Sequence, residues 1–357
     1  MKHPMMQKLA AVVAFVALTA VLLALCDFLL TDDIHSYSRV MLSELYEQAG
    51  EIDTLFIGSS HCYRSVDPDA VNRRLGVHSF NAGTSQQLPD GAYYMLREAG
   101  SQNELKTVYV EMFYTTYNNK SSSQVPLACY LITDYMDPLS PNRYAYLWEM
   151  GGLAAFADLL MPARHAIADP GELPELLRAK LTDGYEPGNY RYVTYPDEGE
   201  EYRGNGFVYT WGIPYYGFDT LLNVDARKPI TDFGWEYLNR IADYCEENGI
   251  RLVLFSSPLP SAYAANTENY QAYVDALRAF CAQRKSQYWD FTLYRDAFVG
   301  FEDYADAHHL NGQGAEKFTQ VLCDVMAADE AGNDVQAWFY ETLEEKLANA
   351  PDDTLGR

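Results

Sequence analysis

The stretch Thr54-Leu55-Phe56-Ile57-Gly58-Ser59-Ser60-His61 is a short apolar run that ends in a turn of small residues. A run of this kind, bounded by Gly and Ser, is typical of a buried strand. In open α/β sheets, ligands bind beyond the carboxyl ends of the strands, and Ser60 would be exposed there beside backbone N–H groups. A nucleophile needs that exposure and its oxyanion needs those donors, so we expect Ser60 to be a nucleophile. A serine-rich turn that only satisfies its own backbone is the alternative.

Short apolar runs alternate with amphipathic stretches on both sides of this turn. Asp67-Pro68 is a typical helix start and Gly76 a typical helix end, which predicts a helix over residues 67–75. Strands that alternate with helices predict an α/β fold whose parallel sheet is covered on both faces. The other predicted strands are residues 77–80, 107–110, 250–255 and 288–291, and the other predicted helices are residues 35–50, 90–99, 235–248, 270–284, 314–326 and 335–347.

A second polar group of residues, Asp306-Ala307-His308-His309-Leu310-Asn311, lies in a loop before a predicted helix. A carboxylate three residues ahead of a histidine can bond one ring nitrogen and leave the other facing a nucleophile. We therefore expect Asp306 to orient His309, and His309 to take the proton of Ser60. Two alternatives stay open. One is a solvated polar loop, and the other is a metal site that includes Asp303, although its spacing matches no common ligand pattern.

Taken together, the two blocks resemble the SGNH/GDSL hydrolase superfamily over about residues 52–116 and 231–328. The resemblance implies a three-layer α/β/α fold of the flavodoxin-like type. It implies that Ser60 is the nucleophile and that Asp306 and His309 complete a catalytic triad. The family's second block falls on Asn81-Ala82-Gly83-Thr84-Ser85, so the N–H groups of Gly83 and Ser60 would form the oxyanion hole. No cofactor or metal is implied.

The third block departs from the family pattern. The usual Gly-x-Asn-Asp, whose Asn donates to the oxyanion, is replaced by Val110-Glu111-Met112-Phe113-Tyr114, and Asn118 and Asn119 lie too far along to map onto it. Losing one such donor can cost ~3 kcal/mol in the transition state. The same departure occurs in a membrane-tethered branch of the superfamily, which the Gly-Ser-Ser block on a single-anchor protein resembles. That branch is similar to the teichoic-acid D-alanine-transfer protein and the alginate O-acetylation proteins. That branch implies an envelope polysaccharide as substrate and a membrane-bound O-acyltransferase as partner.

The N-terminus predicts a membrane anchor. Lys2 and Lys8 precede a predominantly apolar run over residues 9–30, and Asp32-Asp33 follow it. At ~1.5 Å per residue, a helix of this length crosses a hydrocarbon core of ~30 Å. The positive-inside rule places residues 1–8 in the cytoplasm, so we expect a single-pass cell-membrane protein whose catalytic domain is extracytoplasmic. A cleaved signal peptide is the alternative.

The pattern changes between residues 118 and 229, which we interpret as an insertion rather than a separate domain. Residues 185–218 are rich in Gly, Pro and Tyr. Tyrosine rings stack on sugars and their hydroxyls bond sugar hydroxyls, so we expect a lid whose tyrosines from Tyr185 to Tyr216 contact the acceptor. Packing of an irregular lid core is the alternative. The predicted parts are a cytoplasmic end (1–8), an anchor (9–30), a neck (31–50), an α/β domain (51–328, with the insertion at 118–229) and a C-terminal helix and tail (329–357).

Composition narrows the possible partners. The chain has 50 acidic and 26 basic residues, giving a formal charge of -24. Such a surface repels phosphate backbones, so we do not expect nucleic-acid binding. The six cysteines form no C-x-x-C pair, and Cys245, Cys281 and Cys323 lie in predicted helices, where buried thiols are expected.

The residues therefore favour a serine acyl-ester hydrolase or O-acyltransferase that works outside the cytoplasm, on a cell-envelope glycan or polyol, through an acyl-enzyme at Ser60. Hydrolysis and transfer are not distinguished. The departure in the third block favours the alternative, a non-catalytic envelope protein that binds glycan or scaffolds an assembly.

Overall fold

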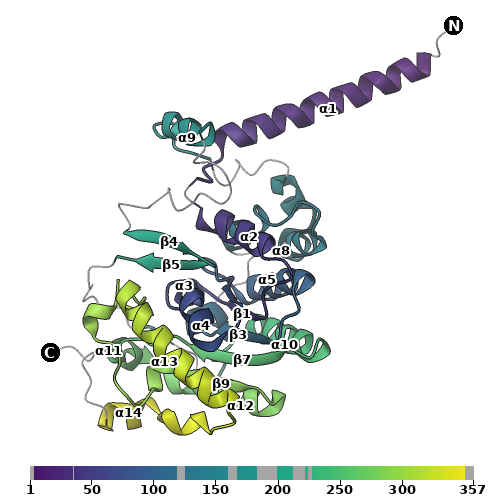
Figure 1. Cartoon of the computed structure of the whole chain (residues 1–357). Coiled ribbons are helices and arrows are strands. Elements are labelled where there is room, and N and C mark those ends of the chain that lie inside the picture. The colour runs from purple at the N-terminus through teal and green to yellow at the C-terminus, as the bar shows by residue number, and fades with distance from the viewer. Residues whose placement is uncertain are drawn as a thin grey trace.

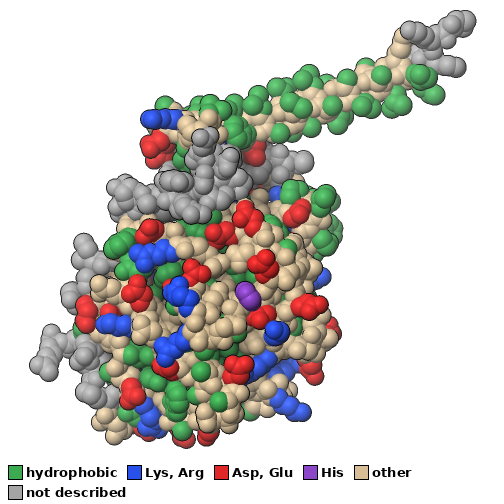
Figure 2. Space-filling view, viewed as in Figure 1, with side chains coloured by type: hydrophobic (Ala, Val, Ile, Leu, Met, Phe, Trp, Pro, Cys, Tyr) green, Lys and Arg blue, Asp and Glu red, His purple; other side chains and the backbone are tan. Residues whose placement is uncertain are grey.

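A computed structural model describes residues 4–34, 36–118, 125–159, 167–182, 199–211, 222–223 and 227–349 of the 357-residue chain. Helix α1 (Pro4–Leu30) projects from the body of the molecule (Figure 1). Figure 2 shows its surface as almost wholly hydrophobic, in contrast to the mixed charges over the body. Its stretch Met5–Leu30 is long and apolar enough to cross a membrane. A retained anchor and a signal sequence share these properties.

A five-stranded parallel sheet in the order β2-β1-β3-β7-β9 forms the centre of the body. This confirms the predicted α/β class with a parallel sheet. The second predicted strand begins two residues later than expected, since its pairing with β1 starts at Ser79 opposite Thr54. The strands are β1 (Thr54–Ile57), β2 (Ser79–Asn81), β3 (Thr107–Glu111), β7 (Arg251–Ser256) and β9 (Gln287–Asp290).

The two faces of the sheet pack into different apolar clusters, as alternation along a strand requires. Leu55 and Ile57 of β1 share one cluster with side chains of α5 (Pro89–Gln102), α10 (Asp232–Glu247) and α12 (Tyr270–Arg284). Phe56 lies in a second cluster with α13 (Gly312–Glu330) and Val71 of α4 (Pro68–Leu75). The same alternation holds in β3 and β7. Consecutive residues of a strand therefore face opposite groups of helices.

Helix starts follow the expected capping chemistry. The Asp67 carboxylate accepts the N–H groups of Asp69 and Ala70 ahead of α4, and Thr231 and Asn311 cap α10 and α13 in the same way. Short elements complete the body: α2 (Tyr37–Glu47), α3 (Ser60–Tyr63), α6 (Tyr114–Tyr117), α11 (Ser261–Ala265), β6 (Leu222–Asn223), β8 (Thr267–Glu268) and the 3-10 turns Phe291–Leu293 and Phe301–Asp303. All six cysteines are free thiols, and Cys245, Cys281 and Cys323 are buried as expected.

One predicted helix, residues 335–347, is wrong. The chain forms a 3-10 turn at Val335–Trp338 and a separate helix α14 at Leu343–Asn349. Between them, Phe339 forms a bridge with Tyr294 and the Tyr340 N–H donates to the Leu293 carbonyl at 2.8 Å. These bonds hold two apolar side chains in the core, and a continuous helix would remove them.

The described parts of the insertion lie in four places, one of which is β6 (Leu222–Asn223), paired with β8. Helices α7 (Pro126–Thr133) and α8 (Pro141–Leu159) contact α5, and their buried side chains belong to the same apolar cluster as Leu55 and Ile57. Helix α9 (Leu173–Lys180) lies beside the end of α1 (Figure 1). Strands β4 (Glu200–Gly204) and β5 (Phe207–Thr210) form an antiparallel hairpin. The described parts therefore do not form one continuous cover, and the lid stays a prediction for the residues outside them.

Helix α9 is fixed to the end of the anchor by a buried lysine. The Lys180 ammonium donates to the carbonyls of Phe28 at 2.5 Å and Thr31 at 2.6 Å, and it pairs with Asp33 at 3.1 Å. The Ala168 N–H donates to the Leu30 carbonyl at 2.9 Å. The last carbonyls of a helix have no partner within the helix, so these bonds stabilise the point where α1 meets the body.

Candidate active site

Ser60 is the first residue of α3, directly beyond the carboxyl end of β1. Gly58 makes the turn possible, because its φ is 152° and an added Cβ would lie 2.5 Å from the Glu111 Cβ. Ser59 caps the helix, since its Oγ accepts the His61 N–H at 3.3 Å. The turn therefore places Ser60 beyond the carboxyl end of β1, the position predicted from the sequence.

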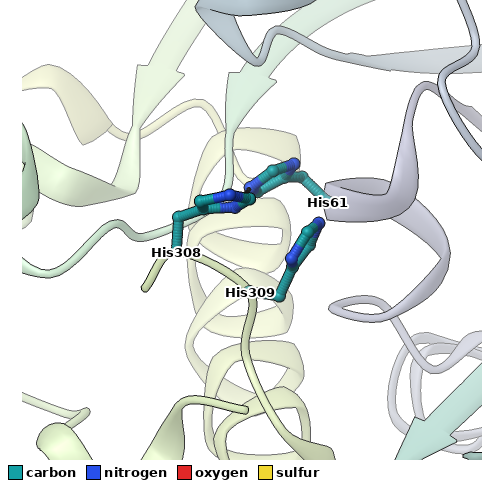
Figure 3. Close-up of side chains that lie close together, drawn as sticks. All are labelled: His61, His308 and His309. Carbon is teal, nitrogen blue, oxygen red and sulfur yellow. Dashed lines mark hydrogen bonds between the residues drawn. The ribbon is translucent and has the colours of Figure 1, made fainter. Parts of the chain in front are cut away.

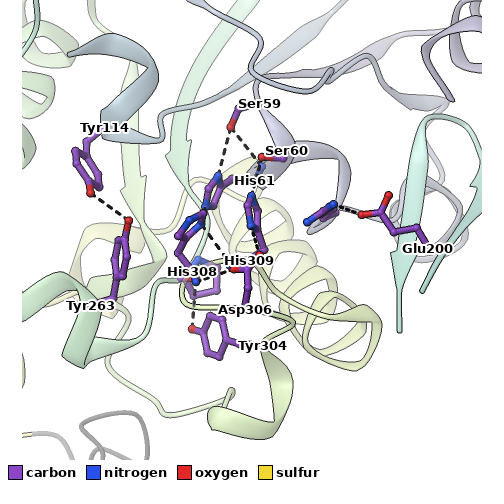
Figure 4. A network of polar contacts seen from close by, with 12 residues as sticks. Ser59, Ser60, His61, Tyr114, Glu200, Tyr263, Tyr304, Asp306, His308 and His309 are labelled. Carbon is purple, nitrogen blue, oxygen red and sulfur yellow. Dashed lines mark hydrogen bonds and ion pairs between the residues drawn. The ribbon is translucent and has the colours of Figure 1, made fainter. Parts of the chain in front are cut away.

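The structure brings Ser60, His309 and Asp306 into one hydrogen-bonded chain (Figure 4). Ser60 Oγ lies 2.7 Å from His309 Nε2, across 249 residues of sequence. His309 Nδ1 lies 2.7 Å from Asp306 Oδ2. The other carboxylate oxygen of Asp306 accepts the N–H groups of His308 at 2.9 Å and His309 at 2.8 Å. This is the order of contacts that a serine nucleophile, its base and an orienting acid require.

The loop that carries Asp306 and His309 is closed by its own backbone. The Ala305 N–H donates to the His309 carbonyl at 2.9 Å, and the Asn311 N–H donates to the Asp303 carbonyl at 2.8 Å. The Asp303 carboxylate is fully buried, pairs with Lys317 at 2.7 Å and accepts the Gly300 N–H. Asp303 therefore stabilises the loop from behind, and its carboxylate is not part of the histidine cluster.

Burial and charge set the protonation of these groups. Burial raises the pKa of Asp306, but the hydrogen bond and charge of His309 outweigh it, and the pKa is lowered well below its usual range. Burial lowers the pKa of His309, although Asp306 partly opposes this shift. Burial and the neighbouring histidines also lower the pKa of His308 to about 4 and that of His61 well below its usual value. Near neutral pH His309 is therefore uncharged, which is the state that a general base needs.

The predicted oxyanion donors are placed differently. The Ser60 N–H belongs to the first residue of a helix, where geometry allows no partner within the helix. Gly83 lies against the nucleophile turn, since an added Cβ would be 3.1 Å from the Gly58 carbonyl and from Cys62. However, the Gly83 N–H donates to Asn81 Oδ1 at 3.1 Å. Gly83 therefore contributes a donor only if this bond is shared or broken, and its role stays a prediction.

Three histidines gather at this site, and one ring nitrogen from each lies within 4.8 Å of the other two (Figure 3). His61 Nε2 lies 3.0 Å from His308 Nδ1. The His61 ring stacks on His309, with centroids 4.3 Å apart and planes at 26°. In this arrangement His61 Nε2 and His308 Nδ1 contact each other directly, so a metal ion would have to replace that contact. Sequence reasoning gave His61 and His308 no role, although each adjoins a predicted catalytic residue.

The β4–β5 hairpin lies against both halves of the site. Glu200 of β4 forms an ion pair with Arg64 at the end of α3 (Figure 4). Tyr209 of β5 packs so closely on Gly312, at the start of α13, that an added Cβ would meet its ring at 2.1 Å. The hairpin thus bridges the nucleophile helix and the helix that follows the His309 loop.

Only two of the predicted lid tyrosines fall within the described residues. The Tyr202 hydroxyl donates to Glu44 at 2.6 Å, and the Tyr209 ring lies under the Arg203 guanidinium at 3.4 Å. Both are buried and contact other side chains of the protein, and their contact with an acceptor stays a prediction. The others lie outside the described residues: Tyr185, Tyr190, Tyr192, Tyr195, Tyr215 and Tyr216.

A model of an uncharacterised protein family matches residues 222–329. A search of the curated proteins found no match to the chain. The matched region runs from β6 to near the end of α13 and contains Asp306 and His309. It therefore covers the loop of Asp306 and His309 and leaves out Ser60.

Proposed function

We propose that this protein is a serine acyl-ester hydrolase or O-acyltransferase with an SGNH-type, three-layer α/β/α domain. The observation that carries the proposal is the continuous chain Ser60–His309–Asp306, with both side-chain contacts at 2.7 Å. Helices on both faces of the parallel sheet support the proposed layering. The location of Ser60 beyond a carboxyl strand end is where ligands bind in such sheets.

The reaction proceeds through an acyl-enzyme. Ser60 Oγ attacks the acyl carbonyl while His309 Nε2 takes the hydroxyl proton, and Asp306 stabilises the imidazolium that forms. The Ser60 N–H, joined by Gly83 when its bond to Asn81 is released, donates to the oxyanion. His309 then protonates the leaving alcohol. In the second half, water or an acceptor hydroxyl gives its proton to His309 and attacks the acyl carbonyl. The bond between the acyl group and Ser60 Oγ then breaks, and His309 returns its proton to Ser60 Oγ.

The proposed setting is the outer face of the cell membrane, with α1 as a single-pass anchor. Lys8 near the start of α1 and Asp32 and Asp33 after its end support this orientation. By resemblance, the acceptor is an envelope polysaccharide or polyol, and a membrane-bound O-acyltransferase supplies the acyl group.

Labelling with a fluorophosphonate tests the proposal directly, because this probe phosphonylates activated serines. Full-length protein in detergent should label, and Ser60→Ala should not. Mass spectrometry of the labelled peptide should place the adduct on Ser60 and not on Ser59. Equal labelling of wild type and Ser60→Ala would refute the assignment.

The bond between Gly83 and Asn81, together with the missing third-block Asn, favours one alternative function. In that case the fold binds envelope glycan without catalysis. A folded wild-type protein that neither labels nor hydrolyses p-nitrophenyl acetate would support this second function.

A further inference from the structure

Glu111 is a buried acid at the site that the proposed mechanism does not use. It is the last residue of β3 and is only 1% exposed. Its carboxyl group accepts the Ser59 hydroxyl at 3.1 Å. The backbone N–H groups of Ser59, Phe113 and Ser257 face the carboxyl group and lower its pKa. Since these groups follow the ends of β1, β3 and β7, Glu111 lies where three adjacent strands end, at the edge that carries Ser60.

The contacts continue from Ser59 to the three histidines (Figure 4). Ser59 Oγ lies 3.4 Å from His61 Nδ1, and His61 Nε2 lies 3.0 Å from His308 Nδ1. Phe113 stacks on the His61 ring at 3.6 Å, and His309 stacks on it at 4.3 Å. The orientation of His61 thus limits the orientation of His309.

We propose that Glu111, Ser59 and His61 are positioning residues for the proposed esterase, forming a second hydrogen-bonded chain that ends at His308 and holds the His309 ring toward Ser60. The inference rests on the proposed function. Glu111 stands at the end of the strand where the family's third block would begin. It holds the nucleophile turn and the base, whereas the missing Asn would donate to the oxyanion.

The chain has two possible directions, because each hydroxyl and each neutral imidazole has one proton to donate. With Glu111 ionised, Ser59 donates to Glu111, His61 Nδ1 donates to Ser59, and His308 Nδ1 donates to His61. With Glu111 protonated, every donor and acceptor is reversed. The His308 side chain, 27% exposed, ends the chain nearest to solvent. The protonation of a buried carboxyl therefore sets which tautomers His61 and His308 adopt.

Both directions are accessible near neutral pH, because burial raises the pKa of Glu111 to about 8 although its hydrogen bonds oppose the shift. The other titratable groups facing Glu111 are the Cys62 thiol on α3, Tyr117 on α6 and Tyr273 on α12. Burial raises the pKa of all three, so they stay neutral there. His61 is faced by His308, His309 and Arg64, and their charges lower its pKa further.

The test compares Glu111→Gln with Glu98→Gln, using full-length protein in detergent and p-nitrophenyl acetate. Glu98 lies on α5 and is an equally buried carboxylate. It accepts hydrogen bonds from the side chains of Tyr46, Ser140 and Asn142. We expect Glu111→Gln to lower kcat about 10- to 100-fold with KM within about twofold, because small misplacements of catalytic groups have effects of this size. It should also remove a step in kcat near pH 8. Glu98→Gln should keep both kcat and that step.

A second variant tests the same chain if Glu111→Gln misfolds, and a second measurement applies if the wild type is inactive. His61→Phe keeps the stacked ring but removes both nitrogens, and it should lower kcat in the same way. The low-field proton NMR signal of the Asp306–His309 hydrogen bond should shift in Glu111→Gln and not in Glu98→Gln, whether or not the protein hydrolyses esters. Wild-type kcat, pH profile and NMR signal in Glu111→Gln would overturn the positioning role. An inactive, unlabelled wild type whose signal still depends on Glu111 would overturn the esterase function alone.

Discussion

Replacing Gly312 by alanine tests whether the β4–β5 hairpin is seated on the start of α13. The new Cβ would lie 2.1 Å from two ring atoms of Tyr209, whereas ordinary contacts are 3.4–4 Å, so the ring must move by more than an ångström. Arg203 covers that ring at 3.4 Å and Trp211 lies against it at 4.7 Å, which restricts its movement. Overpacking of this kind costs about 1–3 kcal/mol, and alanine regains at most about 1 kcal/mol of helix propensity.

We therefore expect Gly312→Ala to lower the free energy of unfolding by about 1–2 kcal/mol. Tyr209→Ala should lower it by about 3 kcal/mol, because a buried aromatic ring is lost. In the double variant the clash is gone, so the two effects should fall short of additivity by at least about 1 kcal/mol.

Urea unfolding measures these free energies. It is followed by tryptophan fluorescence, to which Trp211 beside Tyr209 contributes. Gln313→Ala, one residue further along α13 and exposed, is the matched control and should change little. Additivity within about 0.5 kcal/mol would show that the hairpin does not rest on Gly312.

Four further outcomes are expected. Asp306→Asn should lower kcat by about 10²- to 10⁴-fold with little change in KM, since the imidazole loses its orienting partner, and a loss below about tenfold would contradict this role. Because burial lowers the pKa of His309, the neutral base persists below its ordinary value, so the acid limb of kcat/KM should lie below pH 6.5, and a limb above that pH would be inconsistent. Lys180→Ala should speed protease cleavage near the end of α1 in detergent, and an unchanged rate would argue against the α9 contact. Protease added to intact cells should digest the body of the protein, whereas full protection would exclude the proposed orientation.

Much of the fold follows from local signals. Asp67-Pro68 and Gly76 define α4 because capping and a glycine end act within one turn of the chain. The predicted helix 270–284 coincides with α12. The C-terminal prediction failed at Phe339 and Tyr340, where contacts to residues about 45 positions away override a helical pattern.

The candidate site likewise contains residues that local sequence signals predict and residues that only tertiary contacts reveal. Ser60 stands out because a glycine turn ends an apolar run, and His309 because Asp306 precedes it by three residues. Glu111 carries no such signal, since it reads as the polar end of a strand until the fold brings Ser59 to it. The partners of the hairpin, Arg64 and Gly312, likewise depend on the tertiary structure. Contacts between distant segments are thus what the sequence pattern leaves open.

The separation of Ser60 and His309 by 249 positions also determines when the site forms. Closing a loop of that length costs ~5 kcal/mol of chain entropy, so this contact forms only once the sheet between the two ends is in place. Synthesis delivers the N-terminal part first, and Ser60 emerges long before the loop that carries its base. A nascent or truncated chain therefore exposes a serine without an activated hydroxyl. The proposed hydrolytic chemistry therefore requires that the last quarter of the chain has been added and folded.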